Sequence, residues 1–462
     1  MATFLLTADG THGDVWPFIR LAEGLGRRGH EAVLFSHQAY ADTAARAGVR
    51  LVATDTAEEY ERLLDDHRDV LLNVLTSVDR VVDFYHRNGI FDQIRAEYEA
   101  MAELARTRPA GEVVLVGRHM SRLSVLLGRE ALGVPAAWVC GYPQQHMGAS
   151  LTQRLYPRGL ADPMNALRGR LGLPPVTDWG TWLSGVDGCV CLWPDWFDTA
   201  GDPAPAGATR AGFLLNDAAE TGPLPAAAAA LVAPSQPRPI LVTAGSGRML
   251  HRDWYATAVA AVAEIGRPGI VVCKYRDLLP ERLPPGLHWF PALPFATLVP
   301  KVAAVLHHGG ILTSARAIRS GTPQVVLAHG VDRPDNARRL RRLGLAEWLP
   351  AARWTTADVA ALLRSVLAEP AYRRRAIDLA PGTDSDAALD TACQALETLL
   401  GRTPTAPAPT RAPATRTATD LSPERAALLR RWLDQRSTRR RGNHAEAAVS
   451  DDEVRRRLDA GR

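Results

Sequence analysis

The sequence predicts an α/β protein with two Rossmann-like domains, each built on a parallel sheet. Short apolar runs alternate with helical patterns over the first 400 residues. Glycine-containing loops follow apolar runs in both halves, at Gly10–Asp14 and Ala244–Gly247. An Ala/Pro/Gly-rich stretch, 206–238, separates these halves. Ligands of open parallel sheets bind beyond the carboxyl ends of the strands, so we expect both sets of loops to face one cleft.

The N-terminal domain is predicted to span residues 1–205. Its first strand, Phe4–Leu6, leads through Gly10–Asp14 into a helix with Pro17 in the first turn. The second strand is Ala32–Phe35. Further apolar runs continue the pattern at 113–116, 136–139 and 188–192.

The C-terminal domain is predicted to span residues 239–401, beginning with the strand Ile240–Thr243. The remaining tail, 402–462, starts as a Pro/Thr/Ala-rich linker. Ser422 and Pro423 then provide a helix start, which predicts a short helix over 422–440. This arginine-rich helix carries an apolar stripe, and we consider both a partner-docking helix and a solvated tail.

Composition excludes several classes of function. Only Lys274 and Lys301 are lysines among 54 basic residues, and the tail holds 14 Arg against 8 acidic residues. The body is therefore nearly neutral, and we expect no nucleic-acid partner. No apolar run approaches the roughly 20 residues that cross a bilayer, and no basic leader precedes the first strand. We therefore expect a cytoplasmic protein without a membrane span.

The five cysteines form no disulfide framework in the sequence. Cys189 and Cys191 lie in a strand-like run, but no partner pair follows at the spacing of a metal site. We interpret them as reduced core thiols. The sequence predicts no metal site.

The stretch after the apolar run Val302–Leu306 predicts an anion site. His307-His308-Gly309-Gly310 forms a tight turn before a helix. The free N–H groups and the dipole of a helix N-terminus favour phosphate, and glycine lets the backbone approach it closely. We expect His307 to add a side-chain donor and His308 to serve in packing. About 20 residues later, Asp332 stands at the next strand-to-helix junction, where its carboxylate can accept hydrogen bonds from sugar hydroxyls.

These residues resemble a known motif. His307-His308-Gly309-Gly310, Thr313, Gly321-x-Pro323, Asp332 and Asn336-Ala337 are similar to the donor site of two-domain nucleotide-sugar glycosyltransferases. The resemblance implies a fold of two Rossmann-like halves (GT-B), with a nucleoside-diphosphate sugar as donor. The resemblance implies contacts with the donor diphosphate from His307, Gly309, Gly310, Thr313, Ser314 and Ser246. It also implies contacts with the donor sugar from Asp332, Arg333 and Asn336, and contacts with the nucleobase of the donor from Phe290 and Leu293. Core packing for Phe290 and Leu293, and a loop-tying role for Asn336, are the alternatives.

Three positions depart from the family pattern: Leu312, Ala328 and Arg333 stand where a small residue, a proline and a glutamine are usual. We expect Leu312 to crowd the diphosphate and Arg333 to alter sugar specificity. These departures favour a rival interpretation, a catalytically silent relative that docks a partner through the helix 422–440. A sugar-nucleotide epimerase of the same fold is a second rival, although no cluster of acid/base carboxylates stands out.

The first loop supplies the candidate base for the acceptor hydroxyl. Gly10-Thr-His12-Gly13-Asp14-Val-Trp-Pro17 is similar to an element in which the residue matching Asp14 is the proposed base. A plain N-cap is the alternative for Asp14. His12 competes for the catalytic role because histidine titrates near neutral pH. We expect an inverting reaction, in which the acceptor oxygen attacks the anomeric carbon in line. Because backbone amides and His307 would replace a cation at the diphosphate, we expect no metal cofactor.

Two further segments narrow the family. Val190–Phe197 and Asn88–Phe91 resemble bacterial relatives that include the rhamnosyltransferase of rhamnolipid synthesis, and the chain also looks like antibiotic glycosyltransferases. This resemblance implies deoxythymidine diphosphate (dTDP) deoxysugars as donors and small lipophilic or natural-product hydroxyl compounds as acceptors. We expect acceptor contacts from Phe84, Tyr142 and His146, with core packing as the alternative for Phe84.

Overall fold

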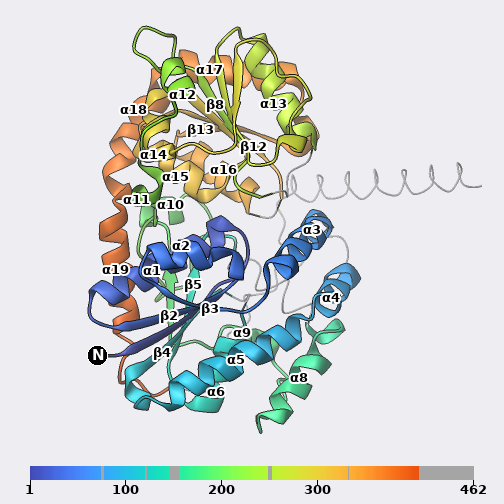
Figure 1. Cartoon of the computed structure of the whole chain (residues 1–462), viewed down its shortest axis with the longest axis vertical. Coiled ribbons are helices and arrows are strands. Elements are labelled where there is room, and N and C mark those ends of the chain that lie inside the picture. The colour runs from blue at the N-terminus through green and yellow to red at the C-terminus, as the bar shows by residue number, and fades with distance from the viewer. Residues whose placement is uncertain (74–77, 120–121, 146–155, 248–251, 331, 405–462) are drawn as a thin grey trace, which may run out of the picture. The chain divides into compact units, whose positions relative to one another are not determined.

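The computed structural model describes residues 1–404 except 74–77, 120–121, 146–155, 248–251 and 331. His146 and the predicted helix 422–440 lie outside these described residues. Two parallel sheets carry the fold (Figure 1). This architecture confirms the predicted α/β class with two Rossmann-like halves.

The N-terminal lobe contains a seven-stranded sheet in the order β3-β2-β1-β4-β5-β6-β7. Every adjacent pair of its strands is parallel. The strands are β1 (Thr3–Thr7), β2 (Glu31–Ser36), β3 (Arg50–Ala53), β4 (Val113–Arg118), β5 (Ala136–Cys140), β6 (Gly188–Cys191) and β7 (Thr209–Arg210). The helices are α1 (His12–Arg27), α2 (Ala41–Arg46), α3 (Ala57–Asn73), α4 (Val78–Arg87), α5 (Ile90–Arg106), α6 (Ser124–Leu132), α8 (Ala161–Arg170), α9 (Trp179–Leu183) and α10 (Asp195–Asp198).

The C-terminal lobe contains a six-stranded parallel sheet in the order β10-β9-β8-β11-β12-β13. Its strands are β8 (Ile240–Thr243), β9 (Gly269–Val272), β10 (Leu287–Phe290), β11 (Ala304–His307), β12 (Gln324–Ala328) and β13 (Ala346–Pro350). The later helices are α11 (Asp217–Glu220), α12 (Ala226–Leu231), α13 (Arg252–Glu264), α14 (Phe295–Leu298), α15 (Ile311–Arg319), α16 (Arg333–Arg342), α17 (Thr356–Ala368), α18 (Pro370–Leu379) and α19 (Ser385–Glu397).

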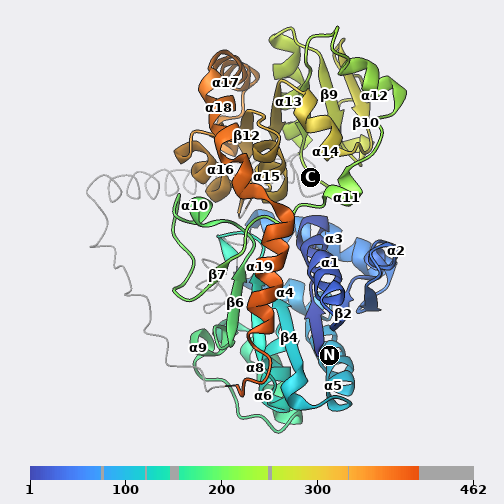
Figure 2. The same cartoon turned by 90° about the vertical axis from the view of Figure 1, so that its left-hand side faces the viewer.

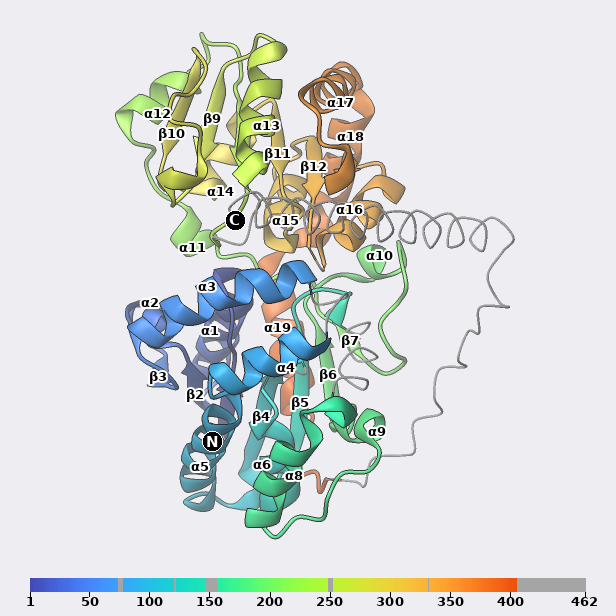
Figure 3. The same cartoon turned by 90° about the vertical axis from the view of Figure 1, so that its right-hand side faces the viewer.

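Helices cover both faces of the first sheet, and side-chain alternation along its strands explains why. Phe4 and Leu6 of β1 pack into one apolar cluster with α1 and α19, whereas Leu5 packs into another with α5 and α6. Successive side chains of a strand point to opposite faces, so a strand that is buried on both faces is apolar throughout. Figure 3 shows α5, α6 and α8 gathered on one side of this sheet.

The predicted domain boundaries differ from the structure at two places. Strand β7 lies within the predicted linker 206–238 but pairs with β6 in the first sheet. Helix α19, which belongs by sequence to the predicted domain 239–401, packs against α1 of the N-terminal lobe (Figure 2). Gly24 of α1 permits this approach, because a Cβ there would lie 2.9 Å from Leu389 Cδ1.

A third apolar cluster joins the two lobes, and we call it the interlobe cluster. Its buried members come from β5, β6, α10, α15, α16 and nearby segments, and include Cys140, Cys191, Trp193, Phe197, Phe213, Ile311, Ala315 and Leu340. Beside it, Arg339 of α16 donates to the carbonyl oxygens of Phe197, Asp198 and Asp202. Arg339 therefore links helix α16 of the C-terminal lobe to the segment that follows β6 of the first sheet.

Candidate functional site

The two glycine loops of the C-terminal lobe begin side by side. Strands β8 and β11 are neighbours, with Thr243 opposite His307, so the loops that follow them leave the same edge of the sheet. Helix α15 starts just after the second loop, with Gly310 as its N-cap. The N–H groups of the first helical turn have no acceptor within the helix, so the positive end of α15 points at this edge.

The structure corrects the prediction for His307. Its side chain is fully buried, and Gly309 N–H donates to Nδ1 over 3.2 Å. Nε2 therefore carries the proton and donates to Gln324 Oε1 at 3.0 Å. Burial lowers the pKa of His307 to about 4. Both ring nitrogens are engaged within the protein, so His307 shapes the turn and does not offer a donor to an anion.

The neighbouring histidine, His308, packs against both glycine loops. The ring of His308 lies between the two glycine loops: a Cβ on Gly245 would be 2.8 Å from its Cε1, and one on Gly310 would be 2.5 Å from its Nε2. Only glycine leaves room for the ring at both positions. The side chain is 7% exposed, and its Nδ1 has no hydrogen-bond partner among the described residues. Burial, reinforced by Arg333 and His307, lowers the pKa of His308 well below its ordinary value.

Three residues that were predicted to contact the diphosphate or the sugar make hydrogen bonds within the loop. The N–H of Gly309 is taken by His307, and Ser314 bonds back to the carbonyl of Gly310 through both its N–H and its hydroxyl. Asn336 is buried and donates to Gly309 O at 3.0 Å and to Asp332 Oδ2 at 3.3 Å. Asn336 therefore ties the loop, as its alternative role predicts, while the direct ligand contacts of Gly309, Ser314 and Asn336 remain predictions.

Asp332 lies at the N-terminus of α16, half-buried, at the end of the strand next to the glycine turn. Burial raises the pKa of Asp332, while the positive charge of Arg333 opposes that shift. Arg333 turns toward its own loop and donates to the carbonyl of His329 at 3.1 Å. Asn336 donates to one oxygen of the Asp332 carboxylate, and the contact of Asp332 with sugar hydroxyls remains a prediction.

The remaining donor-side predictions concern more exposed groups. Thr313 is half-buried in the first turn of α15, and Ser246 is exposed in the loop after β8. Phe290 and Leu293 are half-buried against an apolar cluster beneath the sheet. Leu312 packs against the interlobe cluster, so its side chain has apolar neighbours there.

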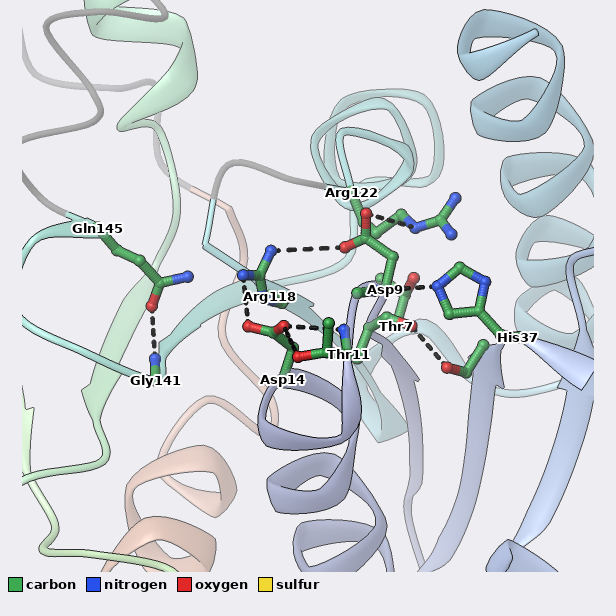
Figure 4. A network of polar contacts seen from close by, with 12 residues as sticks. Thr7, Asp9, Thr11, Asp14, His37, Arg118, Arg122, Gly141 and Gln145 are labelled. Atoms are coloured by element: carbon green, nitrogen blue, oxygen red, sulfur yellow. Dashed lines mark hydrogen bonds and ion pairs between the residues drawn. The ribbon is translucent and has the colours of Figure 1, made fainter. Parts of the chain in front are cut away.

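Asp14 lies in a polar network at the start of α1 (Figure 4). Its Oδ2 accepts from the N–H of Thr11 at 2.9 Å and from the Thr11 hydroxyl at 3.0 Å. Its Oδ1 accepts from Arg118 at 2.6 Å. Thr11 is the N-cap residue and Asp14 is its partner in a capping box, so Asp14 does help to cap the helix, although not as the N-cap itself. The carboxylate is fixed in place from both sides.

Sequence reasoning missed the two arginines of this network. Arg118 ends β4, the strand next to β1, and also lies 3.7 Å from Asp9 and 3.3 Å from the Tyr142 hydroxyl. Arg122 pairs with Asp9 at 3.8 Å and with the buried Glu97 at 3.5 Å. Burial raises the pKa of Glu97. The sequence could have indicated Arg118, because it ends an apolar run and the carboxyl ends of neighbouring parallel strands meet at the same edge of the sheet.

His12 begins helix α1, and the acceptor candidates Tyr142 and Phe84 have different surroundings. The ring of His12 stacks on Trp16 at 5.0 Å between centroids, and desolvation by its surroundings together with Lys274 lowers its pKa. Tyr142 lies at the Asp14 network through Arg118. Phe84 is buried in the apolar cluster with α5 and α6, which confirms core packing, and its acceptor contact remains a prediction.

Residues of the two lobes lie within electrostatic range of each other. Asp14 and Arg118 both act on the pKa of Asp332, Asp332 acts on that of Tyr142, and Lys274 acts on that of His12. The charges of Asp14 in the first loop and of Asp332 in the other lobe are therefore close enough to influence each other. Across the described residues, no helix is long and apolar enough to cross a membrane.

Comparisons with known proteins identify the family. The model described as erythromycin biosynthesis protein CIII-like, C-terminal domain, matches residues 257–399. O-mycaminosyltylonolide 6-deoxyallosyltransferase of Streptomyces fradiae is 30% identical over 436 residues, which cover 86% of this chain and 97% of that protein. Glycosyltransferase GtfC of Amycolatopsis orientalis is 27% identical over 416 residues, 83% of this chain and 94% of that protein.

Solved structures agree in fold. The glycosyltransferase of kitacinnamycin has a TM-score of 0.67 at 21% identity, covering 86% of this chain and 99% of that chain. VinC in complex with dTDP has a TM-score of 0.63 at 20% identity, covering 86% and 100%. With the geometry above, these matches confirm the predicted family. The chain belongs to the two-domain GT-B glycosyltransferases of antibiotic and other natural-product pathways, and it is a glycosyltransferase.

Proposed function

We propose that this enzyme transfers a deoxysugar from a dTDP donor to a hydroxyl of a small lipophilic acceptor, with inversion and without a metal ion. One observation carries the proposal: Asp332, which Asn336 ties to the glycine turn before α15, lies within electrostatic range of the fixed Asp14 carboxylate. Similar proteins support the donor class, since two are named as a 6-deoxyallosyltransferase and a dTDP-epi-vancosaminyltransferase.

In the proposed mechanism Asp14 takes the proton of the acceptor hydroxyl as its oxygen attacks the anomeric carbon. The bond from that carbon to the β-phosphate oxygen breaks on the opposite face, so a single displacement inverts the configuration. The leaving diphosphate gains negative charge at the α15 N-terminus, where the N–H groups of Ile311, Leu312 and Thr313 and the His308 ring stabilise it. These preorganised donors occupy the role that a divalent cation plays elsewhere.

Asp332 orients the sugar in this proposal. Its carboxylate stands at the junction that follows β12, the strand adjacent to β11, and Asn336 holds one oxygen. A carboxylate held on one side accepts hydroxyl hydrogen bonds in a defined direction. Tyr142 is proposed to contact the acceptor because its hydroxyl meets Arg118 beside Asp14.

The two adjacent histidines provide the test of the donor site. We expect His308→Ala to weaken dTDP binding about 10- to 150-fold, the loss of one hydrogen bond to a charged group. His307→Asn is the matched control and should weaken binding less than tenfold while lowering the melting temperature, since its ring only braces the turn. Calorimetric titration of dTDP into both folded variants measures the two affinities. Retained affinity in His308→Ala together with lost affinity in a folded His307→Asn would contradict the assignment.

The pH dependence of donor binding follows from His308. Its pKa is lowered in the free enzyme, and a bound diphosphate raises it because opposite charges favour the protonated ring. The complex therefore holds more protons than the free enzyme, so affinity should rise as pH falls through the pKa of the complex. A dTDP-sugar is the suitable probe, because its phosphates do not titrate near neutral pH. His308→Gln should flatten this dependence, and an equally steep slope in that variant would refute it.

A further inference from the structure

Three of the five cysteines lie together where β5 and β6 end. Cys140 stands opposite Cys191 in the parallel register, and Cys189 lies two residues before Cys191 on the same face. Their three sulfur atoms all lie within 4.8 Å of one another, and those of Cys140 and Cys189 are 3.8 Å apart. Sequence spacing alone revealed only the Cys189-x-Cys191 pair, because Cys140 joins it through strand pairing.

The arrangement is not explained by thiol catalysis or by a disulfide. All three cysteines are free. Cys140 and Cys191 are fully buried, and burial, with the neighbouring sulfurs, raises the pKa of the Cys140 thiol. A buried thiol with a raised pKa is a poor nucleophile. Core packing explains why each cysteine is buried but gives no reason for three sulfur atoms to converge.

The size of the triangle matches three sulfur ligands around one metal ion. In a trigonal planar site the ligands lie √3 bond lengths apart, about 4.0 Å for a metal–sulfur bond of about 2.3 Å. Tetrahedral zinc needs a fourth ligand, and the described residues add no His, Asp or Glu to this group. The neighbouring carboxylate of Asp198 is occupied by Trp193 Nε1, the N–H of Ala204 and Arg210.

We propose that Cys140, Cys189 and Cys191 form a three-sulfur site for a monovalent thiophilic ion, Cu(I). Soft thiolate ligands select Cu(I), and this ion accepts low coordination numbers. Half-buried Cys189 gives the ion a path from solvent, whereas the other two sulfurs lie inside. Binding changes no oxidation state: each thiol that coordinates as thiolate releases its proton to the buffer.

Such an ion would fasten two segments that lead into the active site and the interlobe cluster. Cys140 is followed by Gly141 and Tyr142, whose hydroxyl meets Arg118. Cys191 is followed by Trp193 and Phe197 of the interlobe cluster. The ion is therefore structural: it would stiffen this region without taking part in sugar transfer.

Anaerobic titration of the full, metal-free chain with Cu(I), against a chromophoric Cu(I) chelator, tests the site. We expect one tightly held equivalent, near-ultraviolet thiolate-to-copper absorption, and a melting temperature that rises with Cu(I). Loss of an outer-shell partner costs about 10- to 100-fold in metal affinity, so removing a ligand with Cys189→Ser should cost more than about 100-fold. Cys273→Ser and Cys393→Ser change the two remaining cysteines and should leave the affinity within about threefold.

Several results would overturn the proposal. A wild-type chain that neither competes with the chelator nor gains stability with Cu(I) has no such site. Equal retention of the ion by Cys189→Ser, or equal loss in Cys273→Ser, would show non-specific thiol binding. If Cys189→Ser does not fold, the wild-type measurement and a Cys189→Ala variant decide in the same way.

Discussion

Replacing Asp14 by Asn is expected to lower kcat by about 10²- to 10⁴-fold, the usual contribution of a positioned general base. The amide keeps the shape of the carboxylate but cannot take the acceptor proton. The donor site lies in the other lobe, so affinity for dTDP should change less than tenfold. Steady-state kinetics combined with calorimetric titration of dTDP separates these two effects.

Asp9→Asn is the matched control, because Asp9 belongs to the same network and lies 3.7 Å from Arg118 and 3.8 Å from Arg122, farther than Asp14 lies from Arg118. It should lower kcat less than tenfold. His12→Gln resolves the remaining alternative, since its ring stands at the same helix start. A larger loss in His12→Gln than in Asp14→Asn would assign the base to His12.

Arg339→Met is expected to destabilise the folded chain by about 3–5 kcal/mol, the typical cost of breaking a buried charge network. Arg339 is 1% exposed and pairs with Asp335 at 2.8 Å in addition to its three carbonyl acceptors. Methionine fills similar volume but leaves these four partners without their donor. The melting temperature should fall on the order of 10 °C.

Arg338 supplies the control on the same helix. Its side chain is 54% exposed and lies 3.8 Å from Asp335, so Arg338→Met should change stability by less than about 1 kcal/mol. Differential scanning fluorimetry of both variants gives the comparison. Similar melting temperatures for the two would show that Arg339 does not fasten the lobes.

The sequence predicted the parts of the fold that depend on local pattern. Apolar runs gave the parallel strands, and the glycine turn after Leu306 gave the start of α15, because a buried strand followed by glycines has few alternatives. The packing of helix α19 was less predictable. Helix α19 follows the second sheet in sequence but packs on α1, an association set by the apolar contact of Leu389 and Cys393 with Gly24.

The different surroundings of His307 and His308 have a simple physical cause. His307 is the last residue of β11, and a strand of a sheet covered on both faces buries its side chains. His308 comes one residue later, where the chain has left the strand. We propose that the motif marks the anion site and that the strand end decides which histidine faces it. Arg118 was missed for another reason: it meets Asp14 from 104 residues away.

Binding of dTDP in the presence of a chelator tests the central claim most directly. If the N-terminus of α15 and His308 hold the diphosphate, the wild-type chain binds dTDP with unchanged affinity in excess EDTA. Gly310→Val should abolish that binding, because a Cβ there meets the His308 ring at 2.5 Å and covers the helix start. Affinity that vanishes with EDTA, or survives in a folded Gly310→Val, would contradict the account.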